Sequence, residues 1–294
     1  MNKEAQLQWE ARWARPAALA AFAAAVAFLA QIVMFQAVLD DRRGVEALPD
    51  FLLSVDARPG LFLGSTIVQA IGGLLLLPVF LYLFRATLAR QAAVPRWFVY
   101  LIYVGPVLYA LSAVLGAVDR IDLAHDFADG SPIAGQRGDD RADRLVDDNP
   151  NSLLFGLSFA SSLAVAFLYV MLPLRARRVG LLSPFMSILG VVAGALLVLQ
   201  LVPLVPTIIQ AFWLGAMGAL YLGNWPGGRG PAWDSGEPEP WPSAAQKRGL
   251  APSAERQESE PEPQRDAEPA DAPEGDAEPE RERPASRKRK RKQR

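Results

Sequence analysis

The chain contains 294 residues, of which 51% are hydrophobic, and its formal net charge is −1. It has no cysteine, which excludes disulfides, thiolate metal sites and cysteine nucleophiles. Its single histidine, His125, excludes every site that needs two imidazoles. The small net charge conceals an uneven distribution, because long parts of the chain carry no charged residue.

Four uncharged, mainly apolar segments are each 22 to 24 residues long. A helix needs about 20 apolar residues to cross the hydrocarbon core of a membrane, and a helix of this length in a soluble protein would turn a charged face to water. The segments therefore predict four transmembrane spans, the first of them too long for the apolar part of a cleaved secretory signal. They are residues 16–39, 61–84, 97–118 and 152–174.

A fifth uncharged segment, residues 179–228, is too long for one crossing. Pro203 and Pro206 lie near its middle, and prolines remove backbone donors and interrupt helices. We therefore expect a tight hairpin between two further spans, at 181–202 and 207–223. The alternative is one long kinked helix, which would give five spans and place the C-terminus on the other side of the membrane.

The distribution of Lys and Arg beside the spans predicts how the chain is threaded. With the N-terminus inside, the cytoplasmic segments 1–15, 85–96 and 175–180 hold nine basic residues in 33 positions, whereas the loops on the other side hold seven in 58. Six spans then place both termini in the cytoplasm. The excess of Arg over Lys, with many Ala, Gly and Pro residues, is typical of GC-rich bacterial genomes, so we expect a bacterial cell membrane.

Tryptophans mark the expected membrane boundaries. Trp9 and Trp13 precede the first span, Trp97 begins the third and Trp225 follows the last, as in an interfacial aromatic belt. The linker 224–241 is rich in Trp, Gly and Pro, and its glycines and prolines argue against regular helix. We expect its tryptophans to lie in the cytoplasmic headgroup layer. The alternative is that they fold under the bundle and close its inner mouth.

Residues 242–294 are polar, rich in proline and arranged as an acidic block followed by a basic run. A segment with so little apolar surface cannot offset the entropy of ordering, so we expect a disordered cytoplasmic tail. The basic run is expected to contact anionic lipids or another anionic partner, while pairing with the acidic block competes for the same charges. Nucleic acid is not the expected partner. The basic run consists of Arg287, Lys288, Arg289, Lys290, Arg291, Lys292 and Arg294.

The predicted spans contain no histidine and no acidic residue. An intramembrane serine protease needs a histidine base, and ion-coupled carriers rely on intramembrane carboxylates, so neither class is expected. The principal polar residues of the spans are Gln31, Gln69 and Gln210, which either line a small uncharged cavity or hydrogen-bond between helices. In the acidic loop, His125 and two nearby aspartates lack calcium-loop spacing, so we expect solvated charges. No catalytic residue, metal or cofactor is expected.

Small residues recur at intervals of four in several predicted spans. Gly156 begins one such face in the fourth span, and Gly190 with Gly194 forms another in the fifth. Such faces allow helix backbones to approach closely in lipid. We interpret them as packing surfaces within the bundle; the alternative is the seam of a homo-oligomer. Outside the spans, LPDFLLSVDA at 48–57 predicts a short interfacial helix.

Two stretches near the end of the apolar region resemble a known group of proteins. RRVGLLSPFMSILGV at 177–191 and AFWLGAMGALYLGNWPGGRGPAW at 211–233 look like uncharacterised six-helix integral membrane proteins of bacteria. The resemblance covers the last two predicted spans and the linker. It implies the six-helix topology, and it implies no activity and no catalytic residues.

We therefore expect an all-α protein, a polytopic transmembrane bundle of six spans over residues 16–223 with a disordered C-terminal tail. The first hypothesis for its role is a non-enzymatic membrane protein that packs and interacts through its acidic-then-basic tail. The second is a permease or small-molecule-binding membrane protein with an uncharged polar cavity. An enzyme is the least favoured class, because neither an ionised group nor an imidazole is available at membrane depth.

Overall fold

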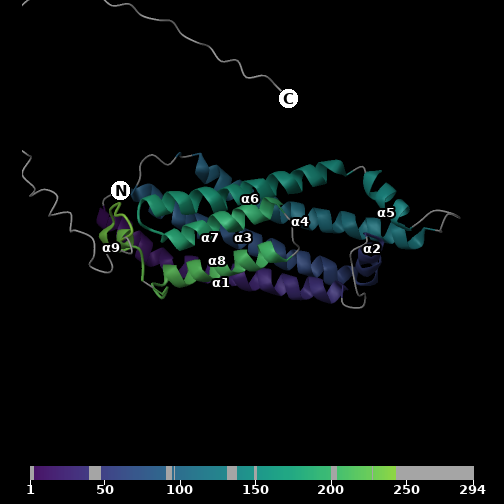
Figure 1. The fold of residues 1–294 in the computed structure, drawn as a ribbon, viewed down its shortest axis with the longest axis horizontal. Coiled ribbons are helices and arrows are strands. Elements are labelled where there is room, and N and C mark those ends of the chain that lie inside the picture. Colours follow the sequence, from purple (N-terminus) through teal and green to yellow (C-terminus); the bar gives the residue numbers. More distant parts are fainter. Residues whose placement is uncertain are drawn as a thin grey trace, which may run out of the picture. The chain divides into compact units, whose positions relative to one another are not determined.

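The computed structural model describes residues 3–39, 48–90, 95, 97–130, 138–148, 151–199, 204–226 and 228–242. The chain divides into two units, Met1–Pro242 and Ser243–Arg294. The predictions for the C-terminal tail and its basic run fall on the second unit and lie outside the described residues. Every regular element in the described part is an α-helix (Figure 1). These are α1 (Lys3–Leu39), α2 (Leu48–Ala57), α3 (Pro59–Arg90), α4 (Phe98–Asp129), α5 (Gly138–Asp147), α6 (Ser152–Arg178), α7 (Pro184–Leu199), α8 (Val205–Tyr221) and α9 (Pro231–Ser235).

Four helices, α1, α3, α4 and α6, are long and apolar enough to cross a membrane. Each coincides with one of the four uncharged segments and continues beyond it; α4, for example, has 32 residues. The other apolar helices, α7 and α8, have only 16 and 17 residues. At 1.5 Å per residue they are about 24 and 26 Å long, shorter than the roughly 30 Å hydrocarbon core.

The two faces of α1 differ as they do in a membrane helix, with small residues inside and larger apolar residues outside. Ala18 and Ala21 are fully buried on the face that packs against α3 and α8. Leu19, Val26 and Val33, spaced by seven, are 65–69% exposed on the opposite face. An exposed apolar stripe is unfavourable in water and natural in lipid, where close backbone approach supplies the packing energy.

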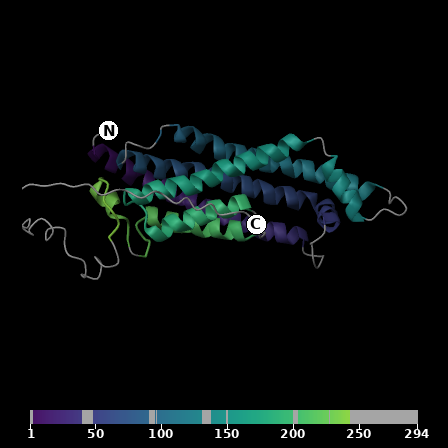
Figure 2. The same cartoon turned by 45° about the horizontal axis from the view of Figure 1, so that its top comes forward.

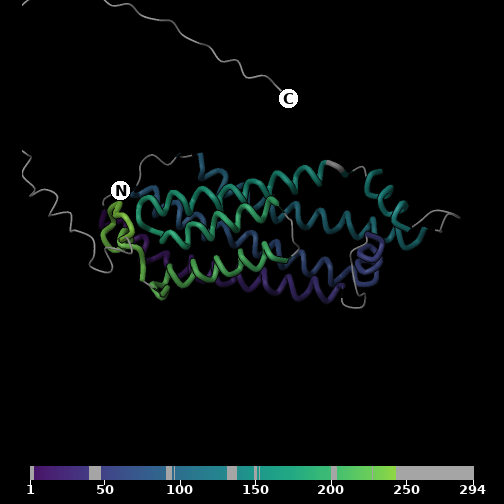
Figure 3. The backbone as a smooth tube through the Cα atoms, viewed as in Figure 1, coloured from purple at the N-terminus to yellow at the C-terminus, as the bar shows by residue number. Residues whose placement is uncertain are grey.

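The helices α7 and α8 form a hairpin whose two open ends lie at the same end of the bundle (Figure 3). α7 packs along α6, while α8 packs along α1 and contacts α7. The indole Nε1 of Trp213 in α8 donates a hydrogen bond to the carbonyl oxygen of Met186 in α7, at 3.1 Å. The predicted hairpin is therefore present, and the alternative of one kinked helix is wrong.

Two glycines of α7 allow the hairpin to lie close against α6. A Cβ added at Gly194 would lie 2.7 Å from the carbonyl oxygen of Ala166, and one added at Gly190 would lie 2.8 Å from the ring of Pro173. These glycines therefore pack within the bundle, as the sequence interpretation states. Gly156 differs, because it is exposed and a Cβ added there would meet nothing within 4 Å.

The two ends of the bundle are built differently, and we name them by the helices found there. The α9 end holds the start of α1, the last turns of α3 and α6, and α9 (Figure 1). The α2/α5 end holds α2, α5 and the last turns of α4, which contact one another (Figure 2). The described parts of the segments 1–15, 85–96 and 175–180 thus meet at one end, as the predicted threading requires.

Helical structure extends further into the acidic loop than the sequence analysis anticipates. α4 continues through the charged residues to Asp129, and α5 forms beyond it with Ala142 fully buried. α2 forms at the predicted 48–57, but its apolar face is covered by protein. Leu52 and Val55 are buried in a small hydrophobic cluster with side chains of α1, α3 and α4.

A buried ion pair joins the elements of the α9 end. Arg90, the last residue of α3, donates to both carboxylate oxygens of Glu10 in α1, at 2.6 and 3.0 Å, and the two side chains are only 0% and 5% exposed. Arg90 Nε also donates to the carbonyl oxygen of Ala232 in α9, at 2.8 Å. Gln6 donates a further hydrogen bond to Glu10. Because both buried charges are hydrogen-bonded to each other and to neighbouring groups, the pair holds α9 against the ends of α1 and α3.

Trp233 lies inside the α9 end, which contradicts the expectation that it lies in the headgroup layer. Its ring stacks on Tyr82 at 5.6 Å, and its Nε1 donates to the carbonyl oxygen of Leu181 at 2.9 Å. Trp225 and Trp241 are only partly buried. The linker also contains the short helix α9, which the sequence analysis does not expect; a proline at its first position is compatible with a helix start.

The four tryptophans predicted as interfacial anchors lie in different surroundings. Trp13 and Trp97 are about half exposed, at 48% and 51%. Trp9 and Trp225 are partly buried against the hydrophobic core, and the Trp9 ring stacks on Tyr82 at 5.7 Å. Trp13 and Trp97 thus keep the exposure that an interfacial anchor needs, whereas Trp9 and Trp225 contribute to the packing of the α9 end.

We expect Arg90→Gln to lower the free energy of unfolding by about 3–5 kcal/mol, because it leaves the Glu10 carboxylate buried without its cation. The measurement is thermal or denaturant unfolding of the detergent-solubilised protein. The double variant Glu10→Leu/Arg90→Met serves as the control, since replacing both charges with apolar groups of similar size removes the unpaired charge. Equal stability of Arg90→Gln and the wild type would contradict this account of the α9 end.

We expect Gly194→Ala to lower the free energy of unfolding by about 1–3 kcal/mol, because the added methyl group meets backbone of α6 and separates the helices. Gly215→Ala in α8 is the matched control. A Cβ there meets nothing within 4 Å, so the change should be neutral or stabilise by up to about 1 kcal/mol through helix propensity. Unfolding in detergent measures both, and equal effects would show that α7 does not depend on this contact.

Candidate binding cavity

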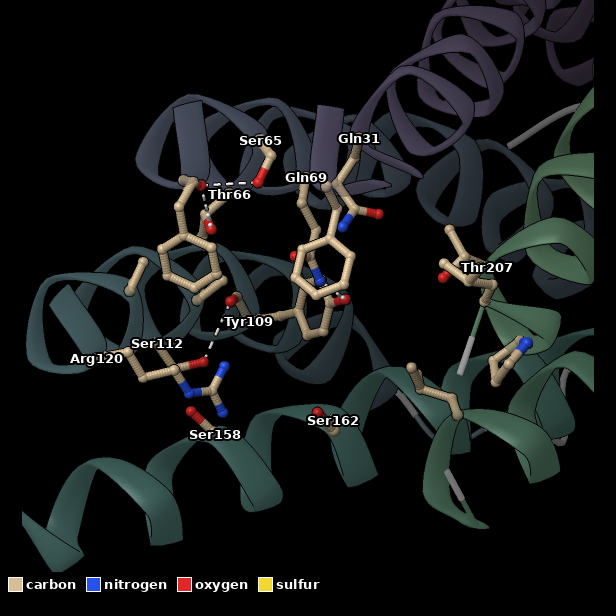
Figure 4. A pocket seen from close by; sticks show the side chains of 17 residues that line it. Gln31, Ser65, Thr66, Gln69, Tyr109, Ser112, Arg120, Ser158, Ser162 and Thr207 are labelled. Carbon is tan, nitrogen blue, oxygen red and sulfur yellow. Dashed lines mark hydrogen bonds between the residues drawn. The ribbon is translucent and has the colours of Figure 1, made fainter. Parts of the chain in front are cut away.

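A polar cavity of about 440 Å³ lies among α1, α3, α4, α6 and the start of α8 (Figure 4). Its volume falls in the usual range of small-molecule sites. The lining contains two amides, one phenol, six aliphatic hydroxyls and one guanidinium among apolar side chains, and no lining residue is acidic. The polar lining residues are Gln31, Gln69, Tyr109, Ser65, Thr66, Ser112, Ser158, Ser162, Thr207 and Arg120.

The cavity exists because the α7–α8 hairpin is shorter than the helices around it. Leu197 near the end of α7 and Leu204 and Pro206 at the start of α8 line its base. α4 lines it from Tyr109 to Arg120, 11 residues or about 16 Å of helix, and then continues beyond it. Space above the tip of the hairpin is therefore enclosed by longer helices and left unfilled by α7 and α8.

Gln69 and Tyr109 form one polar wall of the cavity. Gln69 Nε2 donates to the Tyr109 hydroxyl at 2.8 Å. Tyr109 can lie against α3 because Gly73, one turn from Gln69, has no side chain; a Cβ there would lie 2.8 Å from the tyrosine ring. The hydroxyl proton of Tyr109 and the amide oxygen of Gln69 remain available as donor and acceptor. The pair thus offers both kinds of hydrogen bond to a molecule in the cavity.

Three of the six lining hydroxyls, those of Ser65, Thr66 and Ser112, are hydrogen-bonded within the protein and still keep acceptor capacity. Ser65 and Thr66 donate to the carbonyl oxygen of Phe62 at 2.7 and 3.1 Å. The Ser112 hydroxyl lies 3.0 Å from that of Ser161 across the contact between α4 and α6. A hydroxyl that donates to backbone retains its oxygen lone pairs. The lining is therefore suited to ligands that carry several hydroxyl groups.

Arg120 supplies the positive charge of the lining. Its side chain extends from α4 into the space between α4 and α6, where Ser158 lies (Figure 4). Within the described residues, no carboxylate forms an ion pair with it. The neighbouring Asp119 instead accepts a hydrogen bond from Asn151. A guanidinium free of a carboxylate can bind an anion through two parallel N–H groups.

The structure places Gln31 and Gln69, but not Gln210, in the lining of this cavity. Gln210 is buried on α8, 4% exposed, one turn after Thr207. The sequence analysis misses Tyr109, Arg120 and the hydroxyls. The spacing of Tyr109 and Arg120 could have indicated part of the site, because residues 11 apart lie on nearly the same face of a helix.

Aromatic side chains fill the bundle between the cavity and the α9 end. The rings of Phe80 and Trp213 each meet the ring of Tyr169 edge-on, with centroids 5.1 Å apart, and all three residues are fully buried. They lie about two to three turns beyond the lining residues Gln69, Thr207 and Ser162 of the same helices. This aromatic layer closes the cavity on the side of the α9 end.

A second cavity of about 710 Å³, which we call the apolar groove, adjoins the polar cavity at the α2/α5 end. Its polar lining includes Asp119, Asp147 and Asn151. Arg120 and Ser158 line both spaces, so the two meet at these residues. The apolar lining residues of the groove are Leu48, Phe51, Leu52, Gly116, Leu123, Val146, Leu154 and Phe155.

His125 lies at the α2/α5 end outside both spaces, where its Nδ1 contacts the carboxylate of Asp56 in α2. It therefore pairs across to another helix. Among the residues that the structure describes, no three His, Asp or Glu side chains converge as a metal site requires.

Comparison of the chain with protein-family models, with curated proteins and with solved structures gave no significant match. The resemblance of residues 177–233 to bacterial six-helix membrane proteins therefore stays a prediction. The class of the protein follows from its helices alone, four of which have the length and apolar composition of membrane spans.

Proposed function

We propose that this protein is a multi-pass membrane protein that binds a small, hydroxyl-rich molecule in the polar cavity. The observation that carries the proposal is the cavity itself, in which Gln31, Gln69, Tyr109 and six aliphatic hydroxyls face one space. Polar groups at membrane depth are costly unless they are hydrogen-bonded, and a few that pair between helices suffice for packing. A cluster of this size is accounted for by a polar ligand.

The chemistry of the lining supports binding. Amides and hydroxyls provide neutral donors and acceptors, and Arg120 adds one fixed positive charge. No lining residue is an acid or a histidine, so the cavity has no general base of ordinary pKa. The aromatic layer separates the cavity from the α9 end, as expected of a receptor or of a carrier that faces the α2/α5 end.

The proposal includes the six-span topology in a bacterial cell membrane, with the α9 end in the cytoplasm. The hairpin supports it, because α7 and α8 return the chain to the end where α1 begins. The basic segments that meet at the α9 end support its cytoplasmic side. With 16 and 17 residues, the two hairpin helices would cross a locally thinned bilayer or end just short of its far surface.

The hypothesis of an interaction protein acting through its charged tail rests on residues 243–294, outside the described part of the chain. It stays a prediction, as does a homo-oligomer. Neither conflicts with ligand binding in the cavity, since both concern other surfaces.

The threading predicts which thiols a membrane-impermeant maleimide reaches in whole cells. The chain has no cysteine of its own, and Asp129 and Asp234 are exposed at opposite ends of the bundle. We expect Asp129→Cys to be labelled in intact cells and Asp234→Cys only after the membrane is opened. Labelling of Asp234→Cys in intact cells would show that the α9 end lies outside the cell.

The proposed function predicts a water-filled cavity that a small polyol anion occupies. We expect Ser162→Cys to react with a small sulfonated methanethiosulfonate at least about tenfold faster than Ser187→Cys, because thiolate formation needs water and the Ser187 side chain is buried away from the cavity. Glycerol 3-phosphate should slow the reaction of Ser162→Cys by occupying the cavity, without slowing that of Asp129→Cys.

Ser187→Cys is the matched control, since it makes the same substitution in a neighbouring helix of the bundle. Equal slow rates for Ser162→Cys and Ser187→Cys would show that the cavity is dry. Rapid labelling that glycerol 3-phosphate leaves unchanged would show an open space that does not bind this class of molecule, and the proposed function would then fail.

A further inference from the structure

We propose that the ligand of the polar cavity is a single-chain anionic amphiphile. Its polyol head lies in the cavity, its phosphate lies at Arg120, and its hydrocarbon chain lies in the apolar groove. The inference rests on the proposed function and deepens it by naming the chemical class of the ligand. The observation that supports it is that Arg120 and Ser158 line both spaces.

The order of the three environments along the bundle matches the order of the three parts of such a molecule. Amides and hydroxyls come first, from Gln69 and Tyr109 outward to Ser158. The guanidinium of Arg120 stands at the boundary. Apolar side chains follow, toward Leu123 and Val146 at the α2/α5 end. A polyol, a phosphate and a hydrocarbon chain joined in that order can occupy all three environments at once.

The charges present favour a ligand with one negative charge. Arg120 is the cation that both spaces share. Asp119 and Asp147 line the groove, so a second anionic group placed there would meet carboxylates. Asp119 accepts a hydrogen bond from Asn151. One phosphate diester at the junction satisfies the guanidinium and keeps further charge away from the acids.

The groove provides shelter for a hydrocarbon chain outside the uncharged part of the bundle. α4 becomes charged at Asp119, yet Leu123 and Val146 beyond that level still line the groove. Helices α2 and α5 cover this region and pack against α4. The bound molecule would therefore point its head toward the middle of the bundle, opposite to the lipids of the leaflet at that end. This polarity favours an amphiphile with one chain that arrives from the aqueous side.

Four probes separate the parts of the proposed ligand. Palmitoyl lysophosphatidylglycerol has the polyol head, the phosphate and the chain, and glycerophosphoglycerol, a phosphate diester with the same single negative charge, lacks the chain. Palmitoyl lysophosphatidylcholine replaces the polyol with a cationic head, and monopalmitoylglycerol lacks the phosphate. Native mass spectrometry of the full-length protein released from detergent counts each bound probe directly by its mass.

Two variants of this chain test the two spaces, and a third is their control. Arg120→Gln removes the cation without reducing the polar character of the lining. Gly116→Leu fills the groove, because Gly116 lines it and a Cβ added there meets nothing within 4 Å. Gly215→Leu makes the same substitution at an equally open helical position that lines neither space. Both glycine replacements raise helix propensity, so folding should not distinguish them.

We expect the wild type to bind lysophosphatidylglycerol at least about tenfold more tightly than each of the other three probes. Burial of the hydrocarbon chain and the contact of the phosphate with Arg120 both contribute to its affinity. Arg120→Gln should lose about tenfold or more in affinity for lysophosphatidylglycerol and leave monopalmitoylglycerol unchanged. Gly116→Leu should reduce lysophosphatidylglycerol binding toward the level of glycerophosphoglycerol. Gly215→Leu should match the wild type.

The failures are distinguishable. If lysophosphatidylglycerol binds no more tightly than glycerophosphoglycerol, or if Gly116→Leu and Gly215→Leu bind it equally, the hydrocarbon chain does not lie in the groove and this inference is overturned, while the proposed function stands. If lysophosphatidylcholine binds as tightly as lysophosphatidylglycerol, the polyol head is not recognised and the inference is likewise overturned. Absence of glycerol 3-phosphate protection at Ser162→Cys would instead overturn the proposed function.

Discussion

The ion pair between Glu10 and Arg90 is the interaction on which the arrangement of the α9 end depends. A charge removed from water costs several kcal/mol unless a partner and hydrogen bonds compensate it. Here the two side chains meet through both carboxylate oxygens, and Arg90 also binds the carbonyl oxygen of Ala232. The hydrogen bond to Ala232 holds the linker at the α9 end of the bundle, where Trp233 stacks on Tyr82. Buried polar bonds and aromatic packing together hold the α9 end in place.

The depth of the α7–α8 hairpin determines where the bundle is open. Gly190 and Gly194 fix α7 against α6, and the Trp213 indole ties α8 to the carbonyl oxygen of Met186. Because these contacts hold the hairpin in place, its helices of 16 and 17 residues do not reach far enough to fill the bundle toward the α2/α5 end. The cavity is thus a consequence of helix length, and the polar residues that line it come from the helices that continue past the hairpin.

Two features of the sequence, the segments without charged residues and the prolines, are enough to predict part of the fold. Uncharged segments locate α1, α3, α4 and α6, and Pro203 and Pro206 locate the break between α7 and α8, because both signals are local. The burial of Trp233 could not be predicted, since a Gly- and Pro-rich linker gives no local sign that it is held by Arg90, 142 residues away in the chain. The extension of α4 was hidden in the same way, because acidic residues suggest solvent while packing against α2 and α5 decides the conformation.

The cavity shows the same division between local and long-range information. Gln31 and Gln69 stand out as amides in apolar surroundings, so a sequence reader can single them out. Arg120 does not, because it belongs to a charged stretch in which one arginine looks like any other. Only the meeting of α4 with α6 and the unfilled space above the hairpin give that residue its place between a polar cavity and an apolar groove.

The electrostatics of the α2/α5 end bear on the ligand that we propose for Arg120. The segments 40–60 and 119–151 carry 14 acidic residues against seven basic ones, so anions approaching from that side meet a net negative field. At physiological salt this field is screened over roughly 8 Å, and it acts most strongly on multiply charged solutes. A molecule with one negative charge is repelled least and can regain the lost energy through hydrogen bonds and apolar burial once inside. In the proposed complex, Arg120 would therefore select its ligand through its acidic surroundings as well as through its own charge.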